Sequence, residues 1–114
     1  MIWPIEAKDW PTELSTLVIA GTFRDDDSTA VVPNVASWSL YDGNGAVVNA
    51  RAAVPIAPLT TDYLIVLVGA DLSITTDGRQ RVLVLYYEFD SSVGTDLPQY
   101  VAMPFSINDI KGLA

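Results

Sequence analysis

WSLYDGNGAVVN (Trp38–Asn49) joins two stretches of alternating apolar and polar residues through one acidic residue and two glycines. Clusters of this composition occur in tight turns, and also in loops that hold a cation or a phosphate. A phosphate-binding loop leads into a helix N-terminus, and nothing after Gly45 has a helical pattern. Gly45 can also adopt the positive φ that a short hairpin loop often requires. The stretch therefore predicts a β-hairpin rather than a binding loop.

The length of this turn follows from the residues that it brings into register. A three-residue loop, Gly43–Gly45, sets Leu40 opposite Val48 and Trp38 opposite Ala50. Polar residues then also face polar residues: Ser39 opposite Asn49, and Ser37 opposite Arg51. Loops of two or four residues would pair apolar side chains with polar ones on the same face. Because matched pairs stabilise a hairpin, we expect the three-residue loop.

Similar alternation recurs along the chain between turn signals, and no stretch has a sustained helical stripe. Six strands are expected: Leu17–Phe23, Ala36–Tyr41, Val47–Val54, Tyr63–Val68, Arg81–Phe89 and Tyr100–Ile107. Tyr63–Val68 is apolar on both faces, which is typical of a central strand with neighbours on both sides. In the strand Arg81–Phe89, either of two alternating sets of side chains could be buried. Glu88 is charged and belongs to one set, so we expect the other set, which includes Leu85, to face the core. Pro104 predicts an edge strand or a bulge, because proline has no N–H for the ladder.

Six strands, a possible seventh in an N-terminal arm and turns at roughly ten-residue spacing are typical of an Ig-like sandwich. We therefore expect an all-β fold, an Ig-like antiparallel β-sandwich of about seven strands with an extended N-terminal arm. Residues 1–13 are expected to form the arm and residues 14–114 the β-sandwich domain. The expected core includes Trp38, Leu40, Val66, Leu85 and Phe105. A jelly roll or a small barrel stays open, because the sequence has no cysteine pair and no readable tyrosine corner.

The composition indicates one domain with apolar surface to spare. The 114 residues suffice for one hydrophobic core, and a domain of this size buries only about two-thirds of the surface that its unfolded chain exposes. Hydrophobic residues make up 50% of the chain, and the mean hydropathy is +0.30. Such a surplus indicates an interface with a partner or with another copy, although a tight core with many alanines also accounts for it.

The charge balance argues against nucleic acid and membranes as partners. Lys and Arg number 6 against 14 Asp and Glu, so the net charge is -8 and DNA or an anionic membrane is repelled. The six cations are scattered along the chain: Lys8, Arg24, Arg51, Arg79, Arg81 and Lys111. The N-terminus lacks the basic and apolar segments of a secretory signal. The longest apolar run, Tyr63–Ala70, is far shorter than the about 20 residues of a membrane helix. We expect a protein made without a leader.

The residue types on which most enzymes rely are missing. The chain has no cysteine and no histidine, which excludes a thiolate nucleophile, a cysteine-based zinc site and the commonest general base. Neither G-x-S-x-G nor H-E-x-x-H occurs, and no pair of carboxylates stands out among the 14 acidic residues. We therefore expect no enzymatic activity, no catalytic residues and no cofactor.

Asp25, Asp26 and Asp27 form the densest cluster of charge. Loop carboxylates of this kind coordinate Ca²⁺ in some β-sandwich domains, and Asp25 and Asp27 are the candidate metal ligands. The alternating acids and the glycine of an EF-hand are absent, and a hard cation needs about six oxygens. A solvated loop tip also explains three consecutive acids, so we assign no metal.

The segment IWPIEAKDWP (Ile2–Pro11) repeats the pair Trp-Pro. Proline restricts each preceding tryptophan to extended backbone, so an irregular or strand-like ribbon is expected. Trp3, Ile5 and Trp10 are the expected interface residues, since large apolar side chains often anchor contacts between subunits. Alternatively, the tryptophan rings fold back over the end of the sandwich. A third use is an aromatic platform for sugar, built from Trp3, Trp10, Tyr86, Tyr87 and Tyr100.

Five segments follow one another between Leu17 and Ile107: GTFRDDD, ASWSLYDGNGAVVNAR, VGADL, GRQRVLVLYYEFDSSVG and MPFSI. In this order, and with the short Trp-Pro opening, the chain resembles small bacteriophage virion structural proteins with an Ig-like β-sandwich. The resemblance implies a capsid decoration protein, a neck or tail accessory subunit, or a fibre adaptor. Its location would be the virion and its partners other virion proteins, as a homo-oligomer or an assembly subunit. No catalytic motif comes with the resemblance.

Two other functions fit the same residues. One is an adhesion module that binds carbohydrate or a host surface, with Ca²⁺ held at Asp25–Asp27. The other is an acidic inhibitor of a host protein. The first expectation is a non-enzymatic phage virion protein that acts through protein–protein interfaces.

Overall fold

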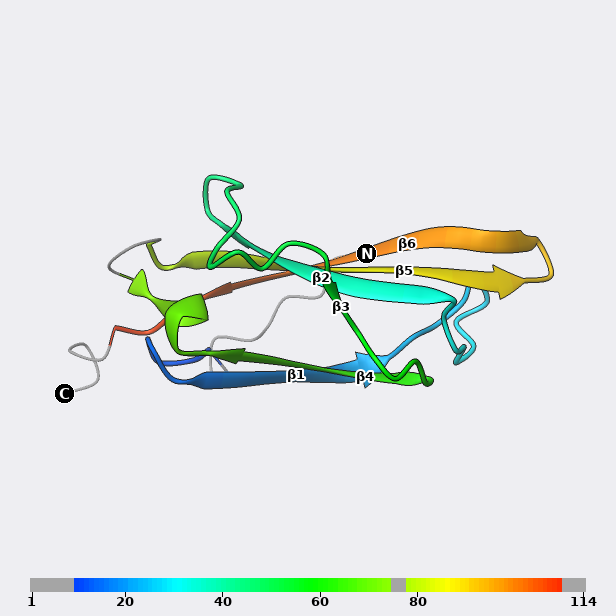
Figure 1. The fold of residues 1–114 in the computed structure, drawn as a ribbon, viewed down its shortest axis with the longest axis horizontal. Helices are drawn as coiled ribbons and strands as arrows, with labels where there is room; N and C mark the ends of the chain where they lie inside the picture. Colours follow the sequence, from blue (N-terminus) through cyan, green and yellow to red (C-terminus); the bar gives the residue numbers. More distant parts are fainter. Residues whose placement is uncertain (1–9, 75–77, 110–114) are drawn as a thin grey trace.

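Two antiparallel sheets face each other in the computed structural model, which describes residues 10–74 and 78–109 (Figure 1). One sheet has the strand order β1–β4 and the other the order β3–β2–β5–β6. The strands are β1 (Thr16–Thr22), β2 (Val35–Asp42), β3 (Val54–Pro55), β4 (Asp62–Val68), β5 (Gln80–Ser91) and β6 (Gly94–Ser106). A short 3-10 helix, η2 (Gly69–Leu72), follows β4. The expected all-β sandwich is confirmed, with these six strands in the described ranges, whereas the Ig-like arrangement stays a prediction.

The core lies between the two sheets and follows from the alternation within each strand. β5 and β6 contribute Leu83, Leu85, Tyr87, Phe89, Val101, Met103 and Phe105. The buried face of β5 is therefore the set that includes Leu85, as predicted from the polar Glu88 on the opposite face. Four of the five expected core residues are buried: Trp38, Leu40, Leu85 and Phe105. Within the described ranges β6 pairs with β5 alone, which confirms the edge position that Pro104 predicted.

The prediction for β4 as a central strand is wrong. Within the described ranges β4 pairs only with β1. Its side chains alternate, with Tyr63, Ile65 and Leu67 buried between the sheets and Leu64, Val66 and Val68 directed outward. Val66 is 42% exposed and does not belong to the core. A strand that is apolar on both faces has the pattern of a central strand even where only one of its faces is covered.

The turn after β2 has the expected three-residue loop. Tyr41 pairs with Val47, as this loop length requires. Gly45 has a φ of 84°, in the left-handed region that favours glycine. One oxygen of the Asp42 carboxylate accepts hydrogen bonds from two N–H groups of the loop, at 2.8 and 3.0 Å. The acid and the glycine therefore build a turn, as predicted.

The strand expected at Val47–Val54 is mostly absent. Three residues between the hairpin and β3 have positive φ: Asn49, Ala50 and Ala53. The chain leaves the sheet there and returns only as β3, where Val54 rather than Ala50 pairs with Trp38. This excursion lets two side chains of the segment reach a buried carboxylate, which is described below.

The described end of the N-terminal segment lies beside the end of β6. Thr12 forms a parallel bridge with Asn108. The Asn108 N–H donates to the Pro11 carbonyl at 2.8 Å, and the Glu13 N–H donates to the Asn108 carbonyl at 2.9 Å. The chain is therefore attached to the sandwich before β1 begins. The division into an arm of residues 1–13 and a domain of residues 14–114 stays a prediction.

Gly21 lies opposite Tyr63 across β1 and β4. A Cβ atom at position 21 would lie 2.3 Å from the Tyr63 hydroxyl oxygen and 2.5 Å from the ring carbon Cζ. Both distances are shorter than van der Waals contacts. The Tyr63 ring is buried, so it cannot turn aside without disturbing the core. The close approach of the ring to the backbone therefore requires glycine here.

We predict that Gly21→Ala lowers the free energy of unfolding by about 1–3 kcal/mol, because the added methyl group overpacks a filled site. Urea denaturation followed by tryptophan fluorescence measures the change. Ala20→Ser, at the exposed neighbouring position, is the control and should alter stability by less than about 0.5 kcal/mol. Equal stability of Gly21→Ala and the wild type would contradict the close approach.

Candidate functional site

A buried carboxylate between β4 and β5 organises one end of the sandwich. Asp71 lies in η2 and is fully buried. Its Oδ1 atom accepts hydrogen bonds from Asn49 Nδ2 at 2.8 Å and from Arg51 Nε at 2.9 Å. Its Oδ2 atom accepts from the Val68 N–H at 3.0 Å and from Arg51 Nη2 at 3.3 Å. Asp71 thereby joins the β2–β3 connection to the end of β4.

Two arginines complete this buried cluster. The Arg51 guanidinium lies over the ring of Trp38, 5.7 Å from the ring centroid, which is a cation–π contact. Arg81 on β5 is buried, and its guanidinium donates to four carbonyl groups from η2 to the start of β5, those of Asp71, Ser73, Gly78 and Gln80, at 2.7 to 3.1 Å. The sequence analysis treated both arginines only as scattered cations and missed their structural role. The one feature that could have revealed Arg81 is its place on the inward-facing side of the alternating pattern of β5.

The surroundings of Asp71 set its charge. Burial by itself raises the pKa of Asp71, but the hydrogen bonds from Arg51, Asn49 and the Val68 N–H outweigh burial and hold this pKa below its ordinary value. The hydrogen bond and the negative charge of Asp71 raise the pKa of Arg51 in turn. The pair is therefore ionised at neutral pH. Because both carboxylate oxygens are occupied by donors of the chain, Asp71 is placed to hold the fold rather than to bind a substrate.

We predict that Asp71→Asn lowers the free energy of unfolding by about 1–3 kcal/mol at neutral pH, because it weakens the charged hydrogen bonds of a buried carboxylate to the partly exposed Arg51. The stability that the carboxylate contributes is present above the ordinary carboxyl pKa of about 4, and it is lost as the pH falls through the lowered pKa of the folded state. Urea denaturation between about pH 2 and pH 8 should show the two proteins converging at the acid end.

The exposed Asp27→Asn is the matched control, since it removes a carboxylate that lies outside the buried cluster. It should follow the wild type throughout this pH range. A difference between Asp71→Asn and the wild type that stays constant from neutral to acid pH would mean that the Asp71 charge does not stabilise the fold.

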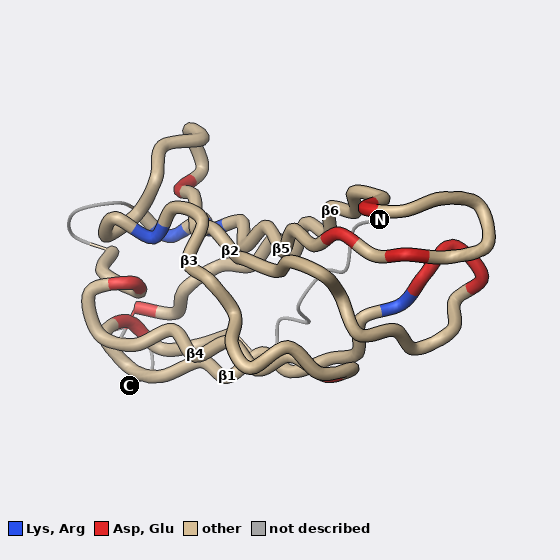
Figure 2. Tube along the Cα trace, turned by 45° about the vertical axis from the view of Figure 1, so that its right-hand side comes forward, with Lys and Arg blue, Asp and Glu red and all other residues tan. Residues whose placement is uncertain are grey.

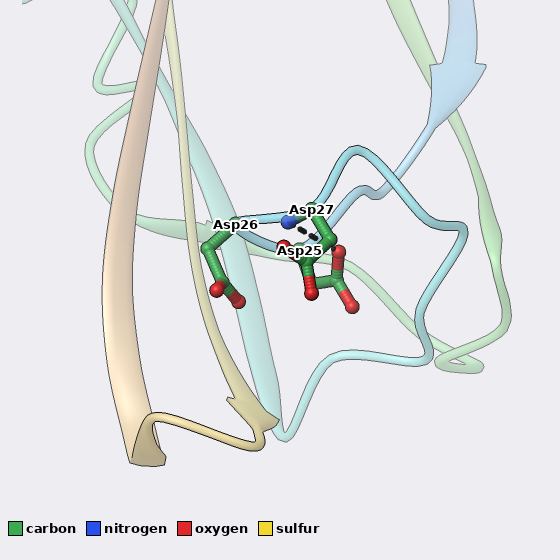
Figure 3. A group of neighbouring side chains, drawn as sticks. All are labelled: Asp25, Asp26 and Asp27. Carbon is green, nitrogen blue, oxygen red and sulfur yellow. Dashed lines mark hydrogen bonds between the residues drawn. The ribbon is translucent and has the colours of Figure 1, made fainter.

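The three consecutive acids lie in the turn after β1, at the end of the molecule that holds the β5–β6 turn (Figures 1 and 2). One oxygen of each carboxylate lies within 4.8 Å of one oxygen of the others. Asp25 Oδ1 accepts hydrogen bonds from the N–H groups of Asp27 and Thr29, at 2.9 and 3.0 Å. In the view of Figure 3 the Asp26 side chain lies to one side of Asp25 and Asp27, and the three carboxylates stay close together. Asp25 therefore fixes the turn, and Asp25 and Asp27 stay candidate metal ligands, with no metal assigned.

The candidate sugar platform is only partly assembled. Tyr86 and Tyr100 are cross-strand partners on the outer face of the four-stranded sheet, with ring centroids 4.8 Å apart. The Tyr86 hydroxyl donates to the Glu88 carboxylate, which raises the pKa of Tyr86 to about 12. Tyr87 is buried, and its hydroxyl donates to the Arg24 carbonyl at 2.6 Å. The expectation that Tyr87 offers a face to sugar is therefore wrong, and for Tyr86 and Tyr100 it stays a prediction.

Of the three expected interface residues, the structure describes Trp10. Its side chain is half-buried and packs against the core, and its carbonyl accepts a hydrogen bond from Asn108 Nδ2 at 3.3 Å. Trp10 thus packs against the sandwich of its own chain. Trp3 and Ile5 lie outside the described residues. The interface role of all three stays a prediction.

The outer face of the β1–β4 sheet is apolar and exposed. It consists of Thr16, Val18, Ala20 and Thr22 on β1 and Asp62, Leu64, Val66 and Val68 on β4. Val18 pairs with Val66 and is 56% exposed, and Leu64 is 63% exposed. The one charged residue of this face, Asp62, lies at its end. The sequence analysis missed this face because it assigned Val66 to the core. The feature that pointed to an exposed apolar surface was the surplus of apolar residues in the composition.

Comparisons with protein families, curated proteins and solved structures find no match for this chain. No helix in the described ranges is long and apolar enough to cross a membrane. The functional interpretation therefore depends on the surfaces and side chains described above.

Proposed function

We propose that this protein is a non-enzymatic structural subunit that acts through protein–protein contacts, and that its assembly is a bacteriophage virion. The observation that supports the contacts is the outer face of the β1–β4 sheet, where exposed apolar side chains adjoin one another: Val18, Leu64, Val66 and Val68. Covering such a strip is favourable through the hydrophobic effect. The resemblance of the sequence to small virion proteins supports the second part of the proposal.

The size of the β1–β4 outer face limits what it can do alone. Two paired strands of 7 residues are about 23 Å long and about 10 Å wide, so the face spans roughly 230 Å². A stable interface buries about 800 Å² on each partner. The face is therefore one of several contacts, each weak by itself. Weak contacts that act together reinforce one another, which favours a subunit of a repeating assembly over a simple pair.

In the proposed assembly the N-terminal segment supplies another contact. Trp3, Ile5 and Trp10 are its proposed anchors, because aromatic and branched side chains bury much area at interfaces. The neighbours are other virion proteins or further copies of the chain. No cofactor takes part, and the mechanism is the burial of apolar surface between subunits.

We predict that Leu64→Lys/Val66→Lys is excluded from the assembly while its fold stays intact, because both side chains point outward and charged groups resist burial in an apolar contact. Phage particles are grown in cells that also make a tagged copy of the chain, and the tag in purified particles is quantified. The tagged wild type should be incorporated, and the double variant should be reduced at least about tenfold.

A matched control is Ser92→Lys/Thr95→Lys, which adds the same charge at exposed positions around the β5–β6 turn. Its incorporation should equal that of the tagged wild type. Circular dichroism and thermal melting of the three proteins show whether the fold is kept. Normal incorporation of a folded Leu64→Lys/Val66→Lys variant would exclude this face as a contact.

A further inference from the structure

A cavity of about 240 Å³ opens between the two sheets, beside the acidic turn. Its wall combines side chains of the core with polar residues of its mouth: Thr22, Arg24, Asp25, Asp26, Ser28, Tyr63, Leu85, Tyr87, Gln99 and Val101. Leu85 and Val101 are core residues of β5 and β6, so the cavity reaches the apolar interior. An engineered cavity of about 150 Å³ in another protein is large enough for benzene. The cavity here has room for a small molecule with an aromatic or branched apolar body.

Tyr63 brings an unused hydroxyl group to this cavity. The residue is 5% exposed, and it lines the cavity. Its hydroxyl makes no hydrogen bond with any residue in the described ranges, and it lies against the backbone of Gly21. No buried side-chain nitrogen or oxygen atom in the described ranges lacks a hydrogen-bond partner, so the Tyr63 hydroxyl is reached from the cavity rather than sealed in the core. It is therefore open to a hydrogen bond from a guest in the cavity.

The mouth of the cavity carries a carboxylate with free oxygens. Asp25 uses Oδ1 to accept two backbone N–H groups of its own turn. The guanidinium of Arg24 donates to the Ser28 carbonyl at 2.9 Å, so it too is engaged within the turn. Asp26 lines the cavity, its carboxylate lies near those of Asp25 and Asp27, and it accepts no hydrogen bond from a described residue (Figure 3).

We propose that this cavity binds a small organic amine with an aromatic or branched apolar body. The protonated amino group lies at the Asp26 carboxylate, the body lies against Leu85 and Val101, and a polar group at the far end of the body pairs with the Tyr63 hydroxyl. A cation is favoured over an anion because Asp25 and Asp26 outnumber Arg24 at the mouth, and because the net charge of -8 attracts cations at long range. This inference is independent of the proposed virion function.

Three probes that share a 4-hydroxyphenylethyl body and differ in the charge of their terminal group test the proposal. Tyramine carries an ammonium group, tyrosol a hydroxyl group in its place, and 3-(4-hydroxyphenyl)propionate a carboxylate. Each is titrated into the full chain labelled with ¹⁵N, and the amide shifts give the site and the dissociation constant. Tyramine should shift the amides around Arg24, Ser28, Gln99 and Val101. It should bind roughly tenfold more tightly than tyrosol, and the propionate should bind most weakly.

Variants separate the two recognition groups. Asp26→Asn should remove the preference for tyramine over tyrosol, because the ammonium then lacks its carboxylate. Tyr63→Phe should weaken both probes several-fold while the melting temperature stays near that of the wild type, since the hydroxyl has no partner in the described chain. Asp27→Asn, which removes a carboxylate that does not line the cavity, should bind like the wild type.

Three results would overturn the proposal. One is the absence of shifts at the cavity residues with millimolar tyramine. The second is binding of the three probes with equal affinity, and the third is a preference for tyramine that survives in Asp26→Asn.

Discussion

The ion pair between the buried Asp71 carboxylate and the partly exposed Arg51 is the constraint on which one end of the sandwich depends. Its carboxylate connects the β2–β3 excursion, the end of β4 and η2, and the Arg81 guanidinium fastens the next connection to β5. Burial of the charge is compensated because each oxygen of Asp71 has two donors. One end of the sandwich is therefore closed by polar groups that satisfy one another. The acidic turn, at the other end, adjoins a cavity with free polar groups at its mouth.

The polar residues therefore have different roles at the two ends. At the end that holds Asp71, the charged side chains stabilise the fold, and they form hydrogen bonds with other groups of the same chain. At the cavity, Asp26 and Tyr63 have hydrogen-bonding capacity that no described residue uses. The outer face of the β1–β4 sheet adds a third kind of surface, apolar and nearly free of charge. Stability, the proposed ligand contact and the proposed subunit contact thus lie in different parts of one small domain.

Much of the fold could be predicted because it depends on local patterns. Alternation located β1, β2 and β5 within about two residues, an accuracy that period-two patterns allow when turn signals flank them. The three-residue loop of the hairpin was predicted correctly because only this length sets apolar residues opposite apolar ones and polar residues opposite polar ones. The strand at Val47–Val54 failed because Asn49 and Arg51 bind a carboxylate more than a dozen residues away, and no local pattern records such a partner. The core assignment of Val66 failed because its exposure depends on whether a second layer covers that face of the sheet, which the strand itself does not encode.

The candidate sites were less accessible to sequence reasoning. The acidic triplet was visible, but its use in a turn and the place of Asp26 in the cavity wall depend on backbone geometry. The cavity arises from the gap between two sheets, so neither Tyr63 nor Asp26 stood out in the chain. The central functional claim, that this protein is a virion subunit, is tested most directly by quantitative mass spectrometry of purified phage particles from its source. The chain should be present at a constant ratio to the major capsid protein after salt washing. Its absence from particles, while it is abundant in the infected cells, would contradict the claim.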